Sequence, residues 1–450
     1  MAALDPLLTL SAREAAAAIA AGQLTARRLA EACLARIAAR EPEVQAWAFL
    51  DPDHVLAEAD RLDALRRAGR PLGPLHGVPV GIKDIIDTAA MPTEHGTVLC
   101  AGRRPARDAT VVRRLRAAGA LVLGKTVTTE LAAFHPGKTR NPHDPTRTPG
   151  GSSSGSAAAV ADGMLPLALG SQTNGSVIRP ASFCGVVGFK PSHGLIGRTG
   201  VLLQSQTLDH VGLFARDVAD AGLLTDVLAG DDEEDPDTRP SAAPRILATA
   251  TADWPLAPDL AFVRTPVWDQ AEPSTHEAFA ELVAALGERI SEVELPEGFA
   301  RAHELHRTIW EADAALNYGP LYDRGREQLS EVMRGMIERG RAVTAVSWHA
   351  AVRASRALRA ALGPLFERHD AIVTPAAPGE APPGLGATGS PVFCTIWTLL
   401  GLPAVSLPLL QGPAGLPLGV QVVGAWGDDA RLLRTAHWLA RRLSDAGGQP

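Results

Sequence analysis

The sequence predicts an α/β protein, in which one large mixed β-sheet is covered by helices on both faces within a single domain of 450 residues. Apolar, partly β-branched runs at residues 78–86 and 120–124 flank a helical pattern at residues 108–118. Two more apolar runs follow near the end of the chain, at residues 403–409 and 415–424. Strand, helix and strand in succession favour a parallel or mixed sheet between helical layers.

The first 70 residues are expected to be helical. Ser11 and Glu14 fit a capping box ahead of an alanine-rich run, residues 25–40 repeat the helical spacing, and residues 52–68 predict a third helix. These helices are interpreted as packing elements without chemistry of their own.

Residues 71–215 contain the candidate site. Lys83 and Asp84 lie inside the strand-like run 78–86, and a buried lysine loses its charge readily, which suits a general base. An ion pair of Lys83 with Asp84 or Asp87 at the strand end is an equally supported alternative. Only four of the 43 basic residues are lysines, at positions 83, 125, 138 and 190, so each lysine in an apolar setting is a candidate base.

Two serine-bearing turns flank one apolar element between residues 149 and 181, in PGGSSSGSAAAVADGMLPLALGSQTNGSVIRPA. The backbone N–H groups of Thr173, Asn174, Gly175 and Ser176 can converge on one oxygen beside the Ser176 hydroxyl, which is what acyl transfer requires. A flexible linker is disfavoured because a dense apolar run follows the first turn. A phosphate loop lacks its lysine, and the G-x-S-x-G elbow is absent.

Residues 216–385 are expected to form a variable region on the substrate side. A strand is predicted at residues 183–190, in the segment that precedes this region. A helix at 217–230 and an exposed acidic, proline-rich loop at 230–244 follow. Trp310 is interpreted as core, whereas Tyr318 and Tyr322 are left between core and substrate pocket. His303 and His306 form only a fragment of a zinc motif and favour a solvated helix face.

The last part of the chain, residues 386–450, is expected to rejoin the sheet. Residues 395–409 predict a helix and a buried strand, 415–424 its hairpin partner, and 428–443 an amphipathic helix with Asp428 or Asp429 near its N-cap. The string from Gly384 to Gly389 matches G-x-G-x-x-G, but it follows two prolines rather than a strand and is interpreted as a loop.

Composition excludes several classes of protein. The hydrophobic content of 46%, the net charge of −7 and a pI near 6.0 favour a globular protein that binds neither nucleic acid nor membranes. The four scattered cysteines, Cys33, Cys100, Cys184 and Cys394, predict buried thiols, no metal site and no disulfide scaffold. We expect a cytoplasmic protein without a cofactor, as a monomer or homodimer.

The chain resembles the amidase signature hydrolases. The resemblance rests on the segment from Pro149 to Pro191, on GVPVGIKDIIDT upstream and on GLPAVSLPL and GLPLGVQVVG near the end, and it spans most of the chain. It implies a triad in which Ser176 is the nucleophile, Ser152 a serine with a cis peptide bond, and Lys83 the base. The oxyanion hole would be formed by the four N–H groups named above, with Gly151 and Ser153 in support.

Two positions depart from the family pattern. Many members carry aspartate four residues before the nucleophile and arginine two residues after it, where this chain has Gln172 and Ile178. Losing both charges together is coherent, since removing one partner leaves an unpaired buried charge. Arg179 is expected either to pack structurally, which is favoured, or to reach toward a substrate carboxylate or carbonyl.

The resemblance implies an amidohydrolase that acts on a small C–N bond. Aryl amides, aliphatic amides and carbamates (urethanes) fit one acyl-enzyme chemistry, as esters do, with Arg179, Trp397 and Tyr318 as candidate substrate contacts. One alternative is the glutamine-hydrolysing A subunit of a tRNA-dependent amidotransferase. Another is a catalytically silent scaffold, which has no physical reason to keep Lys83 beside two serines.

Overall fold

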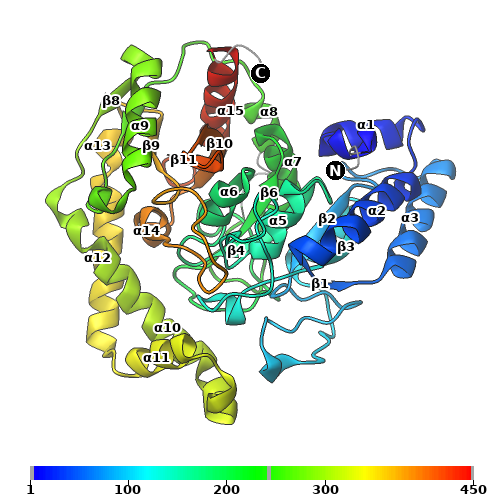
Figure 1. Ribbon diagram of the computed structural model, residues 1–450, viewed down its shortest axis with the longest axis horizontal. Coiled ribbons are helices and arrows are strands. Elements are labelled where there is room, and N and C mark those ends of the chain that lie inside the picture. The colour runs from blue at the N-terminus through cyan, green and yellow to red at the C-terminus, as the bar shows by residue number, and fades with distance from the viewer. Residues whose placement is uncertain (1–4, 241–244, 447–450) are drawn as a thin grey trace.

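The computed structural model describes residues 5–240 and 245–446. One sheet of eleven strands crosses the molecule, in the order β1-β3-β2-β4-β6-β5-β10-β11-β9-β7-β8 (Figure 1). Its strands are β1 (Trp47–Leu50), β2 (Pro79–Lys83), β3 (Leu121–Thr126), β4 (Leu167–Gln172), β5 (Val187–Lys190), β6 (His210–Ala215), β7 (Leu260–Phe262), β8 (Ile290–Glu292), β9 (Ala371–Pro375), β10 (Ala404–Gln411) and β11 (Pro417–Val423).

The sheet is mixed, as predicted. Strand β2 runs parallel to β3 and β4, and β7 runs parallel to β8 and β9, whereas β4, β6, β5, β10, β11 and β9 pair antiparallel in turn. Strand β1 pairs antiparallel with β3. Strand β1 was not predicted, because its four residues are too few for a clear alternation of apolar and polar side chains.

Helices cover the sheet, and the α/β class predicted from the sequence is confirmed. Helices α5 and α6 pack together against the central strands, while α7 contacts β5 and β6 and joins α8 and α15 (Figure 1). The helices are α1 (Ala12–Ala20), α2 (Ala26–Val44), α3 (Pro52–Arg67), α4 (Thr110–Ala117), α5 (Ser154–Ala161), α6 (Ile178–Cys184), α7 (Val218–Leu228), α8 (Ile246–Ala250), α9 (Pro273–Leu286), α10 (Ala302–Gly325), α11 (Glu331–Arg341), α12 (Ala345–Ala361), α13 (Gly363–Phe366), α14 (Val392–Leu399) and α15 (Asp429–Ala446).

The N-terminal helices begin as their sequence predicts. The Ser11 side chain accepts from the Glu14 N–H and the Glu14 carboxylate accepts from the Ser11 N–H, so the capping box is confirmed. Thr25 caps α2 and Asp51 caps α3. At the other end of the chain, Asp429 is the first residue of α15.

Three local predictions were wrong or too long. Residues 183–190 are not one strand, because α6 ends at Cys184 and the left-handed Gly185 (φ 69°) turns the chain before β5. Strand β2 ends at Lys83, so Asp84 lies beyond it. Cys100 is half-buried rather than buried, although all four thiols are free.

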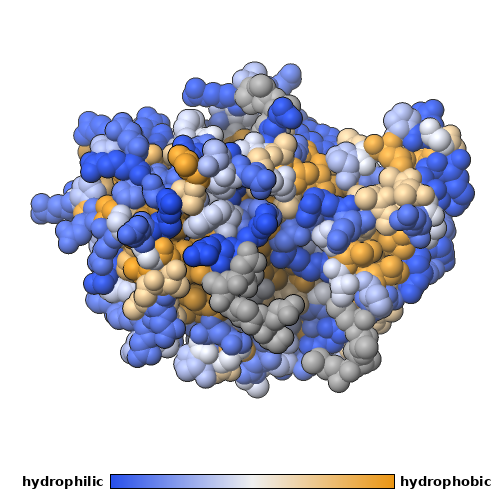
Figure 2. All heavy atoms as spheres, turned by 90° about the horizontal axis from the view of Figure 1, so that it is seen from above, coloured by the Kyte–Doolittle hydropathy of each residue, from blue (hydrophilic) through white to orange (hydrophobic). Residues whose placement is uncertain are grey.

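The acidic loop is only partly exposed. Asp232 and Asp235 are buried, because Asp232 accepts from the Thr199 N–H and Asp235 binds the Arg198 guanidinium. Its last four residues, 241–244, lie outside the described residues. Hydrophilic side chains predominate on the face seen in Figure 2, where apolar residues form separate patches. Within the described ranges, every helix is too short or too polar to cross a membrane.

Candidate active site

The site is built where two parallel strands end side by side. Strands β2 and β4 are neighbours, so Lys83 at the end of β2 lies near Ser171 at the end of β4. Lys83 Nζ is hydrogen-bonded to Ser171 Oγ at 2.8 Å and to Ser152 Oγ at 2.7 Å. Ser152 precedes α5, and the peptide bond between Gly151 and Ser152 is cis. The structure thus brings Lys83 and Ser152 together in the buried interior.

Lys83 has no carboxylate partner among the described residues. Asp84 faces Lys125 instead, with 3.6 Å between Oδ1 and Nζ, and Asp87 is held by Arg103. Burial lowers the pKa of Lys83 well below its ordinary value, and the charge of Asp209 opposes this shift only in part. The ion-pair alternative is therefore not found, and the arrangement fits an uncharged amine.

The other lysines have different surroundings. Lys125 Nζ donates to Ile86 O and Thr93 Oγ1, and Lys190 Nζ donates to Leu402 O. Burial lowers their pKa values to about 8 and about 7. Neither is placed against a serine hydroxyl, and Lys138 is exposed at the surface, so Lys83 alone among the four lies in a serine cluster.

The second serine turn, residues 173–176, joins β4 to α6 and presents its N–H groups. Among the described residues, none accepts a hydrogen bond from the backbone N–H of Thr173, Asn174, Gly175 or Ser176. The next two N–H groups, of Val177 and Ile178, both donate to Gln172 Oε1. Buried N–H groups are almost always paired, so four free ones in a single turn are donors available to a ligand.

The serine turn is held on one side by helix α14. Thr395 Oγ1 donates to Asn174 Oδ1 at 2.7 Å, and Thr398 Oγ1 donates to Asn174 O at 2.5 Å. Gln172 Nε2 donates to Thr398 Oγ1. Gln172 therefore fills the place of the absent acid with neutral hydrogen bonds. The two threonines stand three apart in the sequence, a helical spacing that was the only available signal for them.

Thr173 is held from two further elements. Its hydroxyl donates to Asp209 Oδ1 at 2.6 Å, and Asp209 Oδ2 accepts from the N–H groups of Gln204 and Ser205. On the opposite side, His306 Nε2 lies 2.9 Å from Thr173 O. Burial raises the pKa of Asp209 to about 6 and lowers that of His306 to about 4, so His306 is neutral and its ring N–H donates.

Sequence reasoning missed Asp209, and its interpretation of His306 was wrong. His306 is buried on α10 and does not lie on a solvated face. A histidine one turn from an aromatic residue was the available signal, since His306 packs edge-on against Trp310 with ring centroids 5.6 Å apart. Among the described residues, no group of three or more histidine, cysteine and carboxylate side chains is placed to hold a metal ion.

The predicted supporting residues contact the elements that precede and follow Ser176. The Ser176 side chain forms no hydrogen bond with any described residue, and the residue is 8% exposed. Ser153 Oγ donates to Ser171 O and accepts from the Ser171 N–H, which ties the start of α5 to the end of β4. Gly151 O accepts from Arg179 Nη2.

Arg179 is buried and directed at main-chain carbonyls. Its Nη1 donates to Gly389 O at 2.7 Å and its Nη2 to Gly151 O at 2.5 Å. Burial lowers its pKa to about 10. These contacts join the loop of residues 384–389, where the G-x-G-x-x-G string lies, to the turn before Ser152, which is the structural arrangement favoured from the sequence.

A cavity of about 320 Å³ opens beside the serine turn at Asn174. Its walls include a set of apolar side chains, Phe134, Trp310, Val332, Met336 and Val392. Among the described residues that line it, Glu311 supplies the one carboxylate, which is paired with Arg339 at 2.8 Å. Tyr318 and Trp397 do not line this cavity: both are fully buried, and Tyr318 donates to Leu131 O.

The fold is that of an α/β protein, and comparison with known proteins places it in a family. The family model described as Amidase matches residues 28–433. The chain belongs to the amidase signature family.

Several named proteins are similar to the chain. The glutamyl-tRNA(Gln) amidotransferase subunits A of Chloroflexus aurantiacus and Symbiobacterium thermophilum are 36% and 37% identical, covering 96% and 94% of both chains. Among solved structures, the peptide amidase of Stenotrophomonas maltophilia is 30% identical with a TM-score of 0.84, covering 98% of both chains. A 6-aminohexanoate cyclic dimer hydrolase is 28% identical with a TM-score of 0.86, covering 99% of both chains.

Proposed function

We propose that the chain hydrolyses an amide C–N bond through an acyl-enzyme on Ser176. The observation that carries this proposal is the set of four unpaired N–H groups in the serine turn, next to a buried lysine bonded to Ser152. Donors arranged in advance around a developing oxyanion are the largest single contribution in many acyl transfers, and losing one costs about 3 kcal/mol of barrier.

In the proposed reaction, neutral Lys83 takes the proton of Ser152 as Ser152 takes the proton of Ser176. Ser176 Oγ then bonds to the substrate carbonyl carbon, and the carbonyl oxygen becomes an oxyanion bound by the turn. Returning the proton along the same relay to the leaving nitrogen breaks the C–N bond. Water, activated by the same groups, hydrolyses the ester and releases the acid.

For the substrate, we propose a small amide or carbamate with an apolar group. The aromatic and aliphatic walls of the 320 Å³ cavity support this class, as does the engagement of its one carboxylate with Arg339. A free glutamine would need an acid for its ammonium group. Ester hydrolysis follows from the same acyl-enzyme.

The second candidate is the glutaminase subunit of an amidotransferase. The names of the relatives with 36% and 37% identity favour it over the stand-alone enzyme, and those relatives are subunits, which implies partner chains. In this role the cavity would hold glutamine, with the exposed Arg307 at its rim available for the α-carboxylate.

Covalent labelling tests the chemistry before any substrate is known. Treatment with a fluorophosphonate is expected to add one adduct, mapped to Ser176, that is absent from Ser176→Ala. Lys83→Met should slow labelling by about 10²- to 10⁴-fold, and the wild-type rate should fall toward acid pH as Lys83 becomes protonated. Lys138→Met, at an exposed lysine, is the matched control. An unlabelled wild type, or equal rates for both lysine variants, would contradict the mechanism and favour the silent scaffold.

Ammonia release then separates the two substrate classes. Phenylacetamide, hexanamide and L-glutamine would be compared at equal concentration, with ethyl carbamate followed by release of ethanol. We expect the two apolar amides to be hydrolysed with a higher kcat/KM than L-glutamine. Faster hydrolysis of glutamine would contradict the stand-alone amidase and favour the amidotransferase subunit. Stable co-purification with further subunits would support the same conclusion.

A further inference from the structure

A second, larger cavity lies away from the candidate active site. It has a volume of about 610 Å³ and is bounded by α12, by the end of α14 and by the loops that follow β5 and β11. It shares no lining residue with the cavity beside the serine turn. Nothing in the proposed reaction uses it.

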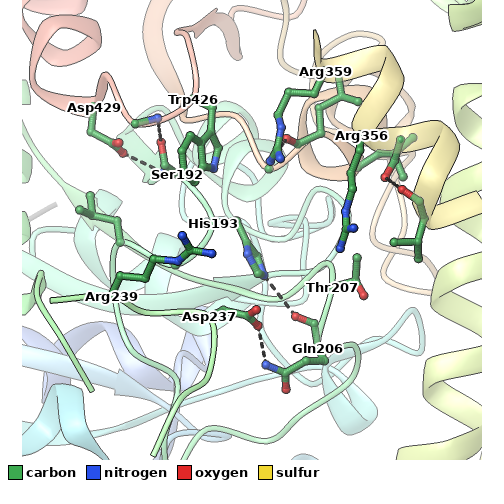
Figure 3. A pocket seen from close by; sticks show the side chains of 18 of the residues that line it. Ser192, His193, Gln206, Thr207, Asp237, Arg239, Arg356, Arg359, Trp426 and Asp429 are labelled. Carbon is green, nitrogen blue, oxygen red and sulfur yellow. Dashed lines mark hydrogen bonds between the residues drawn. The ribbon is translucent and has the colours of Figure 1, made fainter. Parts of the chain in front are cut away.

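Three arginines surround this cavity without a counter-ion. Figure 3 shows the side chains of Arg239, Arg356 and Arg359 around the same hollow. Among the described residues, no carboxylate lies within ion-pair distance of any of the three. Arg356 and Arg359 stand three apart on α12, and burial together with the charge of Arg356 lowers the pKa of Arg359. Like charges at this spacing repel unless an anion lies between them.

The lining also contains two carboxylates, Asp237 and Asp429, and neither is paired with any of the three arginines in the described part of the chain. Asp237 pairs with Arg198 and accepts from Gln206 Nε2. Asp429 is buried and accepts from the Ser192 N–H at 2.7 Å. The lining thus contains three arginines and two carboxylates, which leaves the cavity with a net positive charge.

One wall of the cavity is aromatic and aliphatic. The Arg359 guanidinium lies over the Trp426 ring, 5.2 Å from its centroid, and Trp426 is 53% exposed. Trp348 is fixed by a hydrogen bond from Nε1 to Asp313 Oδ1, and Val352 and Leu400 line the cavity beside it. An exposed tryptophan next to free guanidinium groups suits a ligand with one anionic and one apolar end.

We infer that this cavity binds a small phosphate-bearing molecule, a phosphate monoester with an apolar or aromatic group. A phosphate dianion offers three oxygens and two charges to three guanidinium groups, whereas a single carboxylate offers two oxygens and one charge. The organic group would lie against Trp426, Val352 and Leu400. This site is independent of the chemistry proposed at Ser176.

Titration calorimetry of the full chain tests the site, with phenyl phosphate, inorganic phosphate and phenylacetate as probes. We expect saturable binding of phenyl phosphate with a Kd below about 1 mM, weaker binding of the other two, and loss of affinity as salt rises. Arg356→Gln and Arg359→Gln should each weaken binding by roughly tenfold. Arg353→Gln, which removes an exposed charge from the same helix, should leave it unchanged.

Two further measurements make the result decisive. Thermal unfolding of each variant confirms that it is folded, and Ser176→Ala should bind phenyl phosphate as the wild type does, because the two cavities are separate. The inference is overturned if the wild type binds no probe, if Arg353→Gln weakens binding as much as Arg359→Gln, or if Ser176→Ala alone abolishes it. Tighter binding of phenylacetate than of phenyl phosphate would overturn the assignment of a phosphate.

Discussion

Thr173 illustrates how single side chains prepare the serine turn. Its hydroxyl donates to Asp209, in the loop that precedes β6, and its carbonyl accepts from His306 on α10. The first residue of the turn is therefore held by two separate elements. The acceptor at Asp209 is strong because two further N–H groups orient its carboxylate. The direction of the four free N–H groups depends on contacts of this kind.

Replacing Thr173 by valine tests that dependence. Thr173→Val keeps the shape and removes the hydroxyl, so we expect the acylation rate constant to fall by about tenfold or more while KM changes little. Thr173→Ser keeps the hydroxyl and should restore most of the rate. Single-turnover labelling provides the rate and substrate kinetics provide KM. Equal losses in both variants, or a change in KM alone, would contradict a positioning role.

At the scale of elements, the site depends on how α14 meets the turn between β4 and α6. Gly175 lies against the start of α14, and a Cβ there would be 2.8 Å from Pro391 Cβ and 3.1 Å from Cys394 Sγ. The glycine therefore permits the close approach that lets Thr395 and Thr398 reach Asn174.

Gly175→Ala should displace α14 from the turn. We expect a loss of about 1–3 kcal/mol in the free energy of unfolding and a larger relative loss of fluorophosphonate labelling. Gly386→Ala is the matched control, since a Cβ there meets no atom within 4 Å. Thermal unfolding and labelling rates of both variants provide the comparison, and a fully labelled, fully stable Gly175→Ala would refute the tight contact.

Across the whole molecule, Arg198 connects the acidic loop to the site. It binds Asp235 through two hydrogen bonds and Asp237 through one, and its Nη1 donates to the carbonyls of Gln206 and Asp209. Burial alone would raise the pKa of Asp235, but the hydrogen bonds and charge of Arg198 lower it to about 2. Asp232, Asp235 and Thr238 are thereby buried in a loop whose other acids remain closer to the solvent.

Arg198→Ala should destabilise the protein by about 3–5 kcal/mol, because it leaves a buried carboxylate unpaired. Arg107→Ala, which breaks the exposed pair with Glu234 in the same loop, should leave the free energy of unfolding nearly unchanged. Since the folded-state pKa of Asp235 is depressed, its stabilising effect is present above about pH 4 and is lost as pH falls toward 2.

Thermal unfolding at pH 7 and at pH 2.5 checks this. The difference between wild type and Arg198→Ala should be smaller at the lower pH. A difference that is independent of pH, or a cost equal to that of Arg107→Ala, would contradict the account of the loop.

The sequence by itself determined the α/β class, the family, and the local groups that lie close together along the chain. Lys83 and the two serine turns could be named from motifs, and Gln172 as a departure from the family pattern, because turn chemistry and strand burial depend on consecutive residues. The helix caps followed for the same reason.

Only the tertiary structure decided what surrounds those groups. Asp209, His306 and Thr395 reach the serine turn from segments 36, 133 and 221 positions away. Tyr318 and Trp397 lie in the core and not in the wall of the cavity. The register of β4 on β6 and the docking of α10 and α14 set these contacts. Such contacts depend on how remote elements pack, which no local pattern of residues encodes.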